Sequence, residues 1–280
     1  MNSRKSSFRP AKMKIGTTTF GFRYSFLDAA TSPPLADMIR QAAEMGIERL
    51  QICENVRPLE VPAAQWTEAR RCAADLGVEL QLGCKTLNPE VVEQYIRLAQ
   101  NLSCNQLRIV TEEPEEHLHG TRETVARLLE VIVPRLQAAG LRLAIENHFD
   151  ISSALLVELA AAYPAEAVGF CVDTANSLRS FEPAHEVLRL LRHRAFCYHL
   201  KDYRVIGTMI NFSVIGAPLG EGDLDLDGCL RTIYEHKPVP PLFVETWVPT
   251  ENNRQLDIKL EADWLHRSVQ NLRVRVKNHV

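Results

Sequence analysis

The sequence predicts an α/β protein built as a single closed (β/α)8 TIM barrel, and three observations support this fold class. Eight short apolar or β-branched segments alternate with helical segments at a repeat of roughly 30 residues, the pattern of a parallel sheet. A chain of 280 residues can hold eight such units in one domain. An open doubly wound sheet typically has a Gly-rich phosphate turn after its first strand, and residues 16–21 do not have that form.

Residues typical of helix starts and helix ends mark the boundaries of the predicted elements. Ser32-Pro33-Pro34 opens the first helix and Gly46 closes it, an asymmetry typical of helix ends. The predicted strands are residues 15–20, 49–53, 79–83, 106–110, 142–145, 168–172, 196–199 and 242–244. The predicted helices are residues 36–45, 65–76, a segment beginning at Asn88-Pro89, 124–139, 153–162, 183–192, 226–234 and 255–276.

Residues 14–280 are predicted to form one barrel domain, because no linker or low-complexity tract divides them. Residues 1–13 are basic and lack an apolar segment, so we expect a flexible N-terminal extension and not a signal peptide. No apolar run is long enough to span a membrane. The longest non-helical connection, residues 203–225, is rich in Gly and contains Pro218, which predicts a lid or binding loop.

The composition narrows the class of protein. A net charge of −3 argues against a general electrostatic grip on nucleic acid, which needs a clustered basic face. Seven cysteines without a Cys-x-x-Cys pair indicate reduced thiols. We therefore expect a cytoplasmic protein with no nucleic-acid or membrane partner, and the sequence leaves a homo-oligomer open.

Four consecutive predicted strands each run into a residue type that binds metal ions: Glu146, Asp173, His199 and Glu245. For any one of them alone, a salt bridge to a nearby Arg or Lys is the alternative interpretation, because a buried unpaired charge is costly. The carboxyl ends of barrel strands meet at one mouth, so the four side chains are expected to converge. Three carboxylates and one imidazole suit one divalent ion, Mn²⁺ or Mg²⁺, with Co²⁺ or Zn²⁺ also acceptable.

This set also predicts chemistry. A divalent ion would polarise a carbonyl and a hydroxyl group of a bound substrate. Glu146 and Glu245 would lie on opposite flanks of that substrate, and each could accept or return a proton on carbon as general base and acid. The charge of the metal would stabilise the enediolate formed between the two proton transfers.

The motifs around these residues resemble those of the xylose isomerase-like TIM-barrel family, which includes sugar and sugar-phosphate isomerases and epimerases, keto-sugar-acid lyases and the endonuclease IV group. The resemblance covers the chain from Ile15 to about Leu265. It implies metal ligation by Glu146, Asp173, His199 and Glu245, with Glu146 and Glu245 as the proton-transfer pair. The motifs are Glu146-Asn147-His148, Asp173-Thr174-Ala175-Asn176-Ser177, His199-Leu200-Lys201-Asp202, Val244-Glu245-Thr246-Trp247 and Pro218-Leu219-Gly220-Glu221-Gly222-Asp223.

The sequence departs from the family pattern at two places. Many sugar 3-epimerases have a His three residues after the Asp ligand, whereas this chain has Asn176, which can bond a hydroxyl group but cannot carry a proton. Endonuclease IV members bring extra His and acidic ligands from early strands. Here the ends of strands two to four offer Glu54, Lys85 and Thr111 without a His, so a trinuclear zinc cluster is not expected.

Other residues near the predicted strand ends are candidates for binding the substrate. Cations at the mouth, among them Arg23, would receive a carboxylate or a phosphate and favour an anionic carbohydrate or sugar-acid substrate. The alternative is that they balance local acids, as Lys201 could balance Asp202. The candidate substrate-binding residues are His148, Asn176, Lys85, Lys201, Arg204 and Trp247.

We therefore expect an enzyme of carbohydrate catabolism that enolises a keto-sugar or keto-sugar acid on one divalent ion. An isomerase or epimerase is the first interpretation. The alternative is a lyase that decarboxylates a 3-oxo sugar acid or dehydrates a keto-polyol. An AP-endonuclease-like barrel and a non-catalytic sugar-binding barrel are less favoured, the latter because a pure binding site has no need for both Glu146 and Glu245.

Overall fold

The computed structural model describes residues 14–26, 34–111, 122–149 and 151–279 of the chain. The predicted N-terminal extension, residues 1–13, and the Ser32-Pro33 pair lie outside the described residues.

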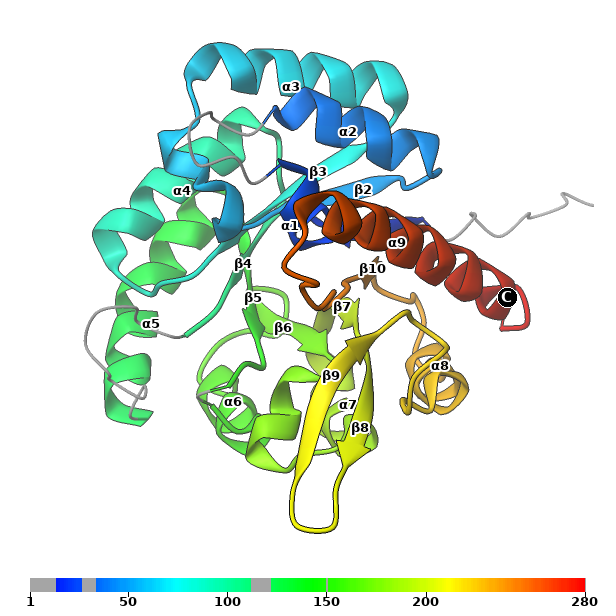
Figure 1. Cartoon of the computed structure of the whole chain (residues 1–280). Helices are drawn as coiled ribbons and strands as arrows, with labels where there is room; N and C mark the ends of the chain where they lie inside the picture. The colour runs from blue at the N-terminus through cyan, green and yellow to red at the C-terminus, as the bar shows by residue number, and fades with distance from the viewer. Residues whose placement is uncertain (1–13, 27–33, 112–121, 150, 280) are drawn as a thin grey trace, which may run out of the picture.

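Eight parallel strands close into a barrel with helices on its outside (Figure 1), as predicted. The hydrogen-bonded order is β1-β10-β7-β6-β5-β4-β3-β2, so each strand lies beside its neighbour in the series and the last closes on the first. The strands of the barrel are β1 (Ile15–Thr18), β2 (Arg49–Ile52), β3 (Glu79–Cys84), β4 (Gln106–Ile109), β5 (Arg142–Glu146), β6 (Val168–Asp173), β7 (Ala195–Leu200) and β10 (Leu242–Val244).

The helices confirm the predicted alternation, with ends that differ from the prediction by a few residues. Asn88 caps α4, since its side-chain oxygen accepts from the amides of Glu90 and Val91. Gly77 ends α3 at a φ of 68°, which glycine adopts without strain. The helices are α1 (Arg23–Phe26), α2 (Leu35–Glu44), α3 (Ala63–Leu76), α4 (Pro89–Asn101), α5 (Arg122–Ala138), α6 (Ser153–Ala160), α7 (Ala184–Leu191), α8 (Leu226–Tyr234) and α9 (Arg254–Val276). In the described part of the chain, none is both long and apolar enough to cross a membrane.

The interior of the barrel is divided between apolar and polar side chains. Because side chains alternate along a strand, residues two positions before the strand-end acids share the interior with them. On the β5–β10 side these residues form the buried cluster Ala144, Cys171, Cys197 and Phe243, together with Phe196. On the β2–β4 side the buried interior positions are polar, namely Gln51, Gln81, Gln106 and Arg108. The strand register aligns the carboxyl ends of neighbouring strands, so that Asp173 of β6 lies opposite His199 of β7.

The predicted lid or binding loop at residues 203–225 is largely an antiparallel hairpin. Its strands, β8 (Asp202–Gly207) and β9 (Phe212–Ala217), follow β7 and project away from the barrel (Figure 1). We attribute the missed strands to the many Gly residues of the segment, which suggested a loop, although apolar residues flank the turn on both sides.

Asp202 ties the base of this hairpin to the loop that follows it. The side chain is 1% exposed. Its two oxygens accept hydrogen bonds from the backbone amides of Tyr203 at 2.8 Å, Gly220 at 2.8 Å, Gly222 at 3.0 Å and Leu224 at 3.0 Å. One buried carboxylate therefore satisfies four amides from two segments.

We expect Asp202→Ala to lower the free energy of unfolding by about 3 kcal/mol, because several buried amides lose their acceptor. Urea denaturation followed by circular dichroism measures the loss. Asp263→Ala is the control, since Asp263 pairs with Arg267 at the surface, where such pairs contribute little. Equal losses in the two variants would contradict the anchoring role of Asp202.

Candidate active site

The four predicted metal-ligand residues meet at the carboxyl ends of the strands. Glu146 ends β5, Asp173 ends β6, His199 lies near the end of β7, and Glu245 directly follows β10. Glu146, Asp173 and His199 are fully buried, and Glu245 is 4% exposed. Apolar strands carry these groups into the interior, where each charge needs a partner.

The distances bring the four side chains into one cluster. Ligand atoms of Glu146, Asp173 and His199 all lie within 4.8 Å of one another. The Nδ1 atom of His199 lies 3.1 Å from Oε2 of Glu245 and 3.6 Å from Oε1 of Glu146. Glu245 therefore joins the group through His199. Their convergence agrees with the sequence, while metal ligation itself stays a prediction.

The donor atoms present fit a divalent cation. Among the described residues, the buried oxygens Glu146 Oε2, Asp173 Oδ2 and Glu245 Oε2 contact the ionisable groups of Arg108, Lys201 and His199 and accept no further hydrogen bond, and neither ring nitrogen of His199 has a hydrogen-bond partner outside these acids. The ion pairs of the cluster join four carboxylates to two cations. The carboxylates are those of Glu54, Glu146, Asp173 and Glu245, and the cations are Arg108 and Lys201. With a neutral imidazole the cluster carries two excess negative charges, which one divalent ion would neutralise.

Arg108 is the functional candidate that the sequence reasoning missed. Its side chain is 2% exposed and pairs with Glu146, and its Nη1 atom lies 2.9 Å from Oε2 of Glu54. Burial alone would raise the pKa of Glu146, but Arg108, His199 and Lys201 together outweigh burial and hold this pKa well below its usual range. The available signal was a charged residue inside the buried strand β4, where charges are rare unless paired.

Lys201 is the second buried cation and lies between two carboxylates. Its Nζ atom is 2.8 Å from Oε1 of Glu245 and 3.1 Å from Oδ2 of Asp173. Burial would raise the pKa of Glu245, but Lys201 and His199 together outweigh burial and lower it to about 2. For Asp173 the balance is reversed, since burial raises the pKa in spite of Lys201.

Asn176 and Asn147 hold this cluster in place. The Asn176 amide nitrogen donates to Oε1 of Glu146 at 2.9 Å, and its oxygen accepts from Nζ of Lys201 at 3.1 Å. Asn147 donates to the backbone oxygen of Asp173 at 2.9 Å and accepts from its amide at 2.8 Å. Asn176 thus bridges an acid and a cation in this site.

A cavity of about 310 Å³ opens onto Glu146, Glu245, Arg108 and Lys201. Five of the six predicted substrate-binding residues line it, namely His148, Asn176, Lys85, Lys201 and Trp247, and so does Arg23. Aromatic side chains of Phe20, Tyr24, Phe149 and Trp247 form an apolar wall. A cavity of this size suits a small molecule such as a monosaccharide derivative.

Arg204 does not line this cavity. It is exposed on β8, and its Nη2 atom donates to the backbone oxygen of Glu221 at 2.9 Å. Because the hairpin β8–β9 projects away from the barrel, none of its residues lines the cavity, although Arg204 follows His199 closely in the sequence. We therefore leave Arg204 out of the candidate binding residues.

Comparison with known proteins places this geometry among related barrels. A family model described as a xylose isomerase-like TIM barrel matches residues 39–268. The chain is 27% identical over 270 residues to 3-oxo-isoapionate decarboxylase of Pectobacterium atrosepticum, covering 94% of this chain and 96% of that protein. The structure resembles an IolI protein with a bound zinc atom, with a TM-score of 0.72, 14% identity and coverage of 96% and 99% of the two chains. It also resembles a D-psicose 3-epimerase determined in the presence of D-fructose, with a TM-score of 0.69, 16% identity and coverage of 94% and 98%.

We expect the affinity for Mn²⁺ to rise with pH by about tenfold per unit between about pH 7 and pH 9. Burial disfavours a charged imidazole, but Glu146 and Glu245 outweigh burial and raise the pKa of His199 to about 10. In this range His199 therefore carries a proton that it must lose to bind the ion. Isothermal titration calorimetry in two buffers of different ionisation enthalpy measures the protons released.

The matched variant for this measurement is His199→Gln, which removes the titrating group and should flatten the pH dependence. An affinity that does not change with pH in the unaltered protein would contradict ligation by His199.

Proposed function

This chain belongs to the xylose isomerase-like TIM barrel family, and we propose that it is a divalent-metal-dependent lyase that decarboxylates a 3-oxo sugar acid. One observation carries the proposal. The two glutamates that an epimerase would use as bases are each paired with a buried cation, Glu146 with Arg108 and Glu245 with Lys201. The similarity to a decarboxylase along almost the whole chain supports the same choice.

The protonation of these glutamates favours decarboxylation over epimerisation. An epimerase needs a base whose pKa lies near the working pH, because it must remove a proton from carbon. The neighbouring cations lower the pKa of Glu146 and of Glu245, which makes both carboxylates weak bases. Decarboxylation needs no base, since carbon dioxide leaves in place of a proton.

Decarboxylation of a 3-oxo acid requires cationic groups that stabilise the enolate. The bond between the carboxylate carbon and its neighbour breaks, and the electron pair moves onto the 3-oxo oxygen as an enolate while carbon dioxide leaves. Lys201 and Arg108 line the cavity and can stabilise this negative charge in a site shielded from water. A divalent ion held by Glu146, Asp173, His199 and Glu245 would supply further Lewis-acid stabilisation of charge on the substrate oxygens.

The second half of the reaction adds one proton to the carbon that lost carbon dioxide. The Lys201 ammonium group stays protonated despite its burial, because Asp173 and Glu245 raise its pKa. It is therefore a weak acid, and its positive charge serves to stabilise the enolate before the proton arrives. Asn176, bonded to both Lys201 and Glu146, can orient a substrate hydroxyl without taking a proton. The aromatic wall formed by Phe149 and Trp247 would exclude water from the enolate.

We expect the Mn²⁺-loaded protein to release carbon dioxide from 3-oxo-isoapionate or another 3-oxo sugar acid, and Lys201→Met to reduce kcat by about 100-fold or more. The reason is that a buried cation facing the enolate is lost. A coupled bicarbonate assay measures the rate, and circular dichroism checks the fold. Arg204→Met is the control, since Arg204 lies outside the cavity, and it should retain full activity.

An epimerase or isomerase remains the second candidate, because Glu146 and Glu245 both face the cavity and both lie near His199. In D₂O a decarboxylase places one deuterium on the product carbon and releases carbon dioxide. Exchange of deuterium into keto-sugars without release of carbon dioxide, followed by NMR, would favour the epimerase and overturn the lyase proposal.

A further inference from the structure

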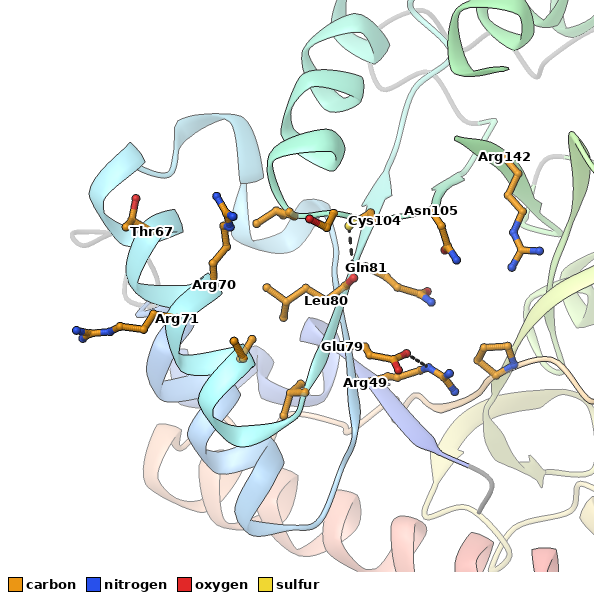
Figure 2. Close-up of a pocket in the computed structure, with 16 residues that line it drawn as sticks. Arg49, Thr67, Arg70, Arg71, Glu79, Leu80, Gln81, Cys104, Asn105 and Arg142 are labelled. Atoms are coloured by element: carbon orange, nitrogen blue, oxygen red, sulfur yellow. Dashed lines mark hydrogen bonds and ion pairs between the residues drawn. The ribbon is translucent and has the colours of Figure 1, made fainter. Parts of the chain in front are cut away.

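A second cavity, of about 1030 Å³, opens at the amino ends of the strands, opposite the active site (Figure 2). It lies among the beginnings of β2, β3 and β5, the loop before β4, and α3. From its lining we propose that this cavity binds a small anion with two or more negative charges, a phosphate ester or a polycarboxylate, and that Arg142 is the main cation that contacts it. The proposal is independent of the reaction at the other end of the barrel.

The lining of this cavity carries an excess of positive charge. Arg49, Arg70, Arg71 and Arg142 line it, and Glu79 is the single carboxylate among its lining residues. Glu79 is already paired, because its Oε2 atom lies 2.7 Å from Nε of Arg49 and its other oxygen pairs with Lys14. The other three arginines therefore have no counterion in the wall of the cavity. Arg70 and Arg71 lie on α3 at one end of it, and Arg142 is the cation that faces Asn105 and Gln81 (Figure 2), which favours an anionic ligand there.

Arg142 is the most informative of these residues. Its guanidinium lies 4.3 Å from the centre of the Phe196 ring, and its Nη2 atom donates to Oε1 of Gln106 at 3.0 Å. Its buried Nε atom has no hydrogen-bond partner among the described residues, and burial lowers the pKa of the group. A half-buried cation without an anion is costly, and an anionic ligand would remove this cost.

Three glutamines form a hydrogen-bonded series next to Arg142 and can supply neutral hydrogen-bond donors to a ligand. Gln106 accepts from Arg142 and donates through Nε2 to Oε1 of Gln81 at 3.1 Å. Gln51 donates to the same Gln81 oxygen at 3.4 Å. With that oxygen committed to two donors, further bonds of the Gln81 side chain come from its NH₂ group. Figure 2 shows Arg142, Asn105 and Gln81 extending toward one space, with Arg49 at its edge.

The arginines at this end are not explained by helix capping. The carboxyl ends of the helices lie at the amino ends of the strands, and their free carbonyls attract cations. Arg194 acts in this way, since it donates to the backbone oxygens of Ala160 and Tyr163 at the end of α6. Arg142, Arg70 and Arg71 donate to no backbone carbonyl within the described ranges, so their charge is available to a ligand.

The test is isothermal titration calorimetry of the full chain, without added metal and at low salt, with pyrophosphate and with citrate as probes. We expect one of them to bind, and the tighter probe identifies the phosphate or the polycarboxylate class. Arg142→Gln should weaken binding about tenfold or more by removing charge-assisted hydrogen bonds. Asn105→Asp, at an exposed residue, should do the same by placing a carboxylate in the cavity.

Two controls make the result specific. Arg189→Gln removes an exposed arginine that pairs with Glu186 on α7, and it should leave the affinity unchanged. Lys201→Met alters the active site and should also leave it unchanged. The proposal is overturned if neither probe binds, if Lys201→Met abolishes binding, or if Asn105→Asp has no effect. Asn105→Asp decides the test even where Arg142→Gln fails to fold.

Discussion

The structure of the site depends on how buried carboxylates are balanced. Glu146, Asp173 and Glu245 lie almost without solvent contact at the ends of apolar strands, and such charges are stable only with partners close by. Arg108 and Lys201 supply part of that balance from inside the barrel. The remaining negative charge makes the cluster a suitable place for a divalent cation, and the same two cations are positioned to stabilise an anionic reaction intermediate.

This arrangement explains how one barrel geometry can serve related reactions. A carboxylate that pairs with a guanidinium or an ammonium group is a weak base, whereas the same carboxylate without that neighbour could remove a proton from carbon. In the function proposed above, Arg108 and Lys201 therefore favour the lyase over the epimerase. Asn176 connects the two halves of the site by bonding both Glu146 and Lys201.

The interior of the barrel links its two ends through polar side chains. Gln106 and Arg108 lie two residues apart on β4: Gln106 bonds to Arg142, which lines the second cavity, and Arg108 lines the active-site cavity. Barrel interiors are commonly filled by branched apolar residues. Here the β2–β4 side is polar, while Cys171, Cys197 and Phe243 fill the other side. The hairpin β8–β9 is anchored separately by Asp202, the first residue of β8, which follows His199 of β7 and Lys201 in the sequence.

The sequence by itself determined the closed barrel and the strand ends that carry Glu146, Asp173, His199 and Glu245. Hydrophobic periodicity is local, and parallel strands of a barrel necessarily bring their ends together. Only the tertiary structure decided that Arg108 neutralises Glu146, that Lys201 lies between Asp173 and Glu245, and that Arg204 lies outside the cavity. Only the tertiary structure shows the second cavity, at the amino ends of the strands. Such partners come from segments far apart in the chain, so no local pattern records which charge meets which.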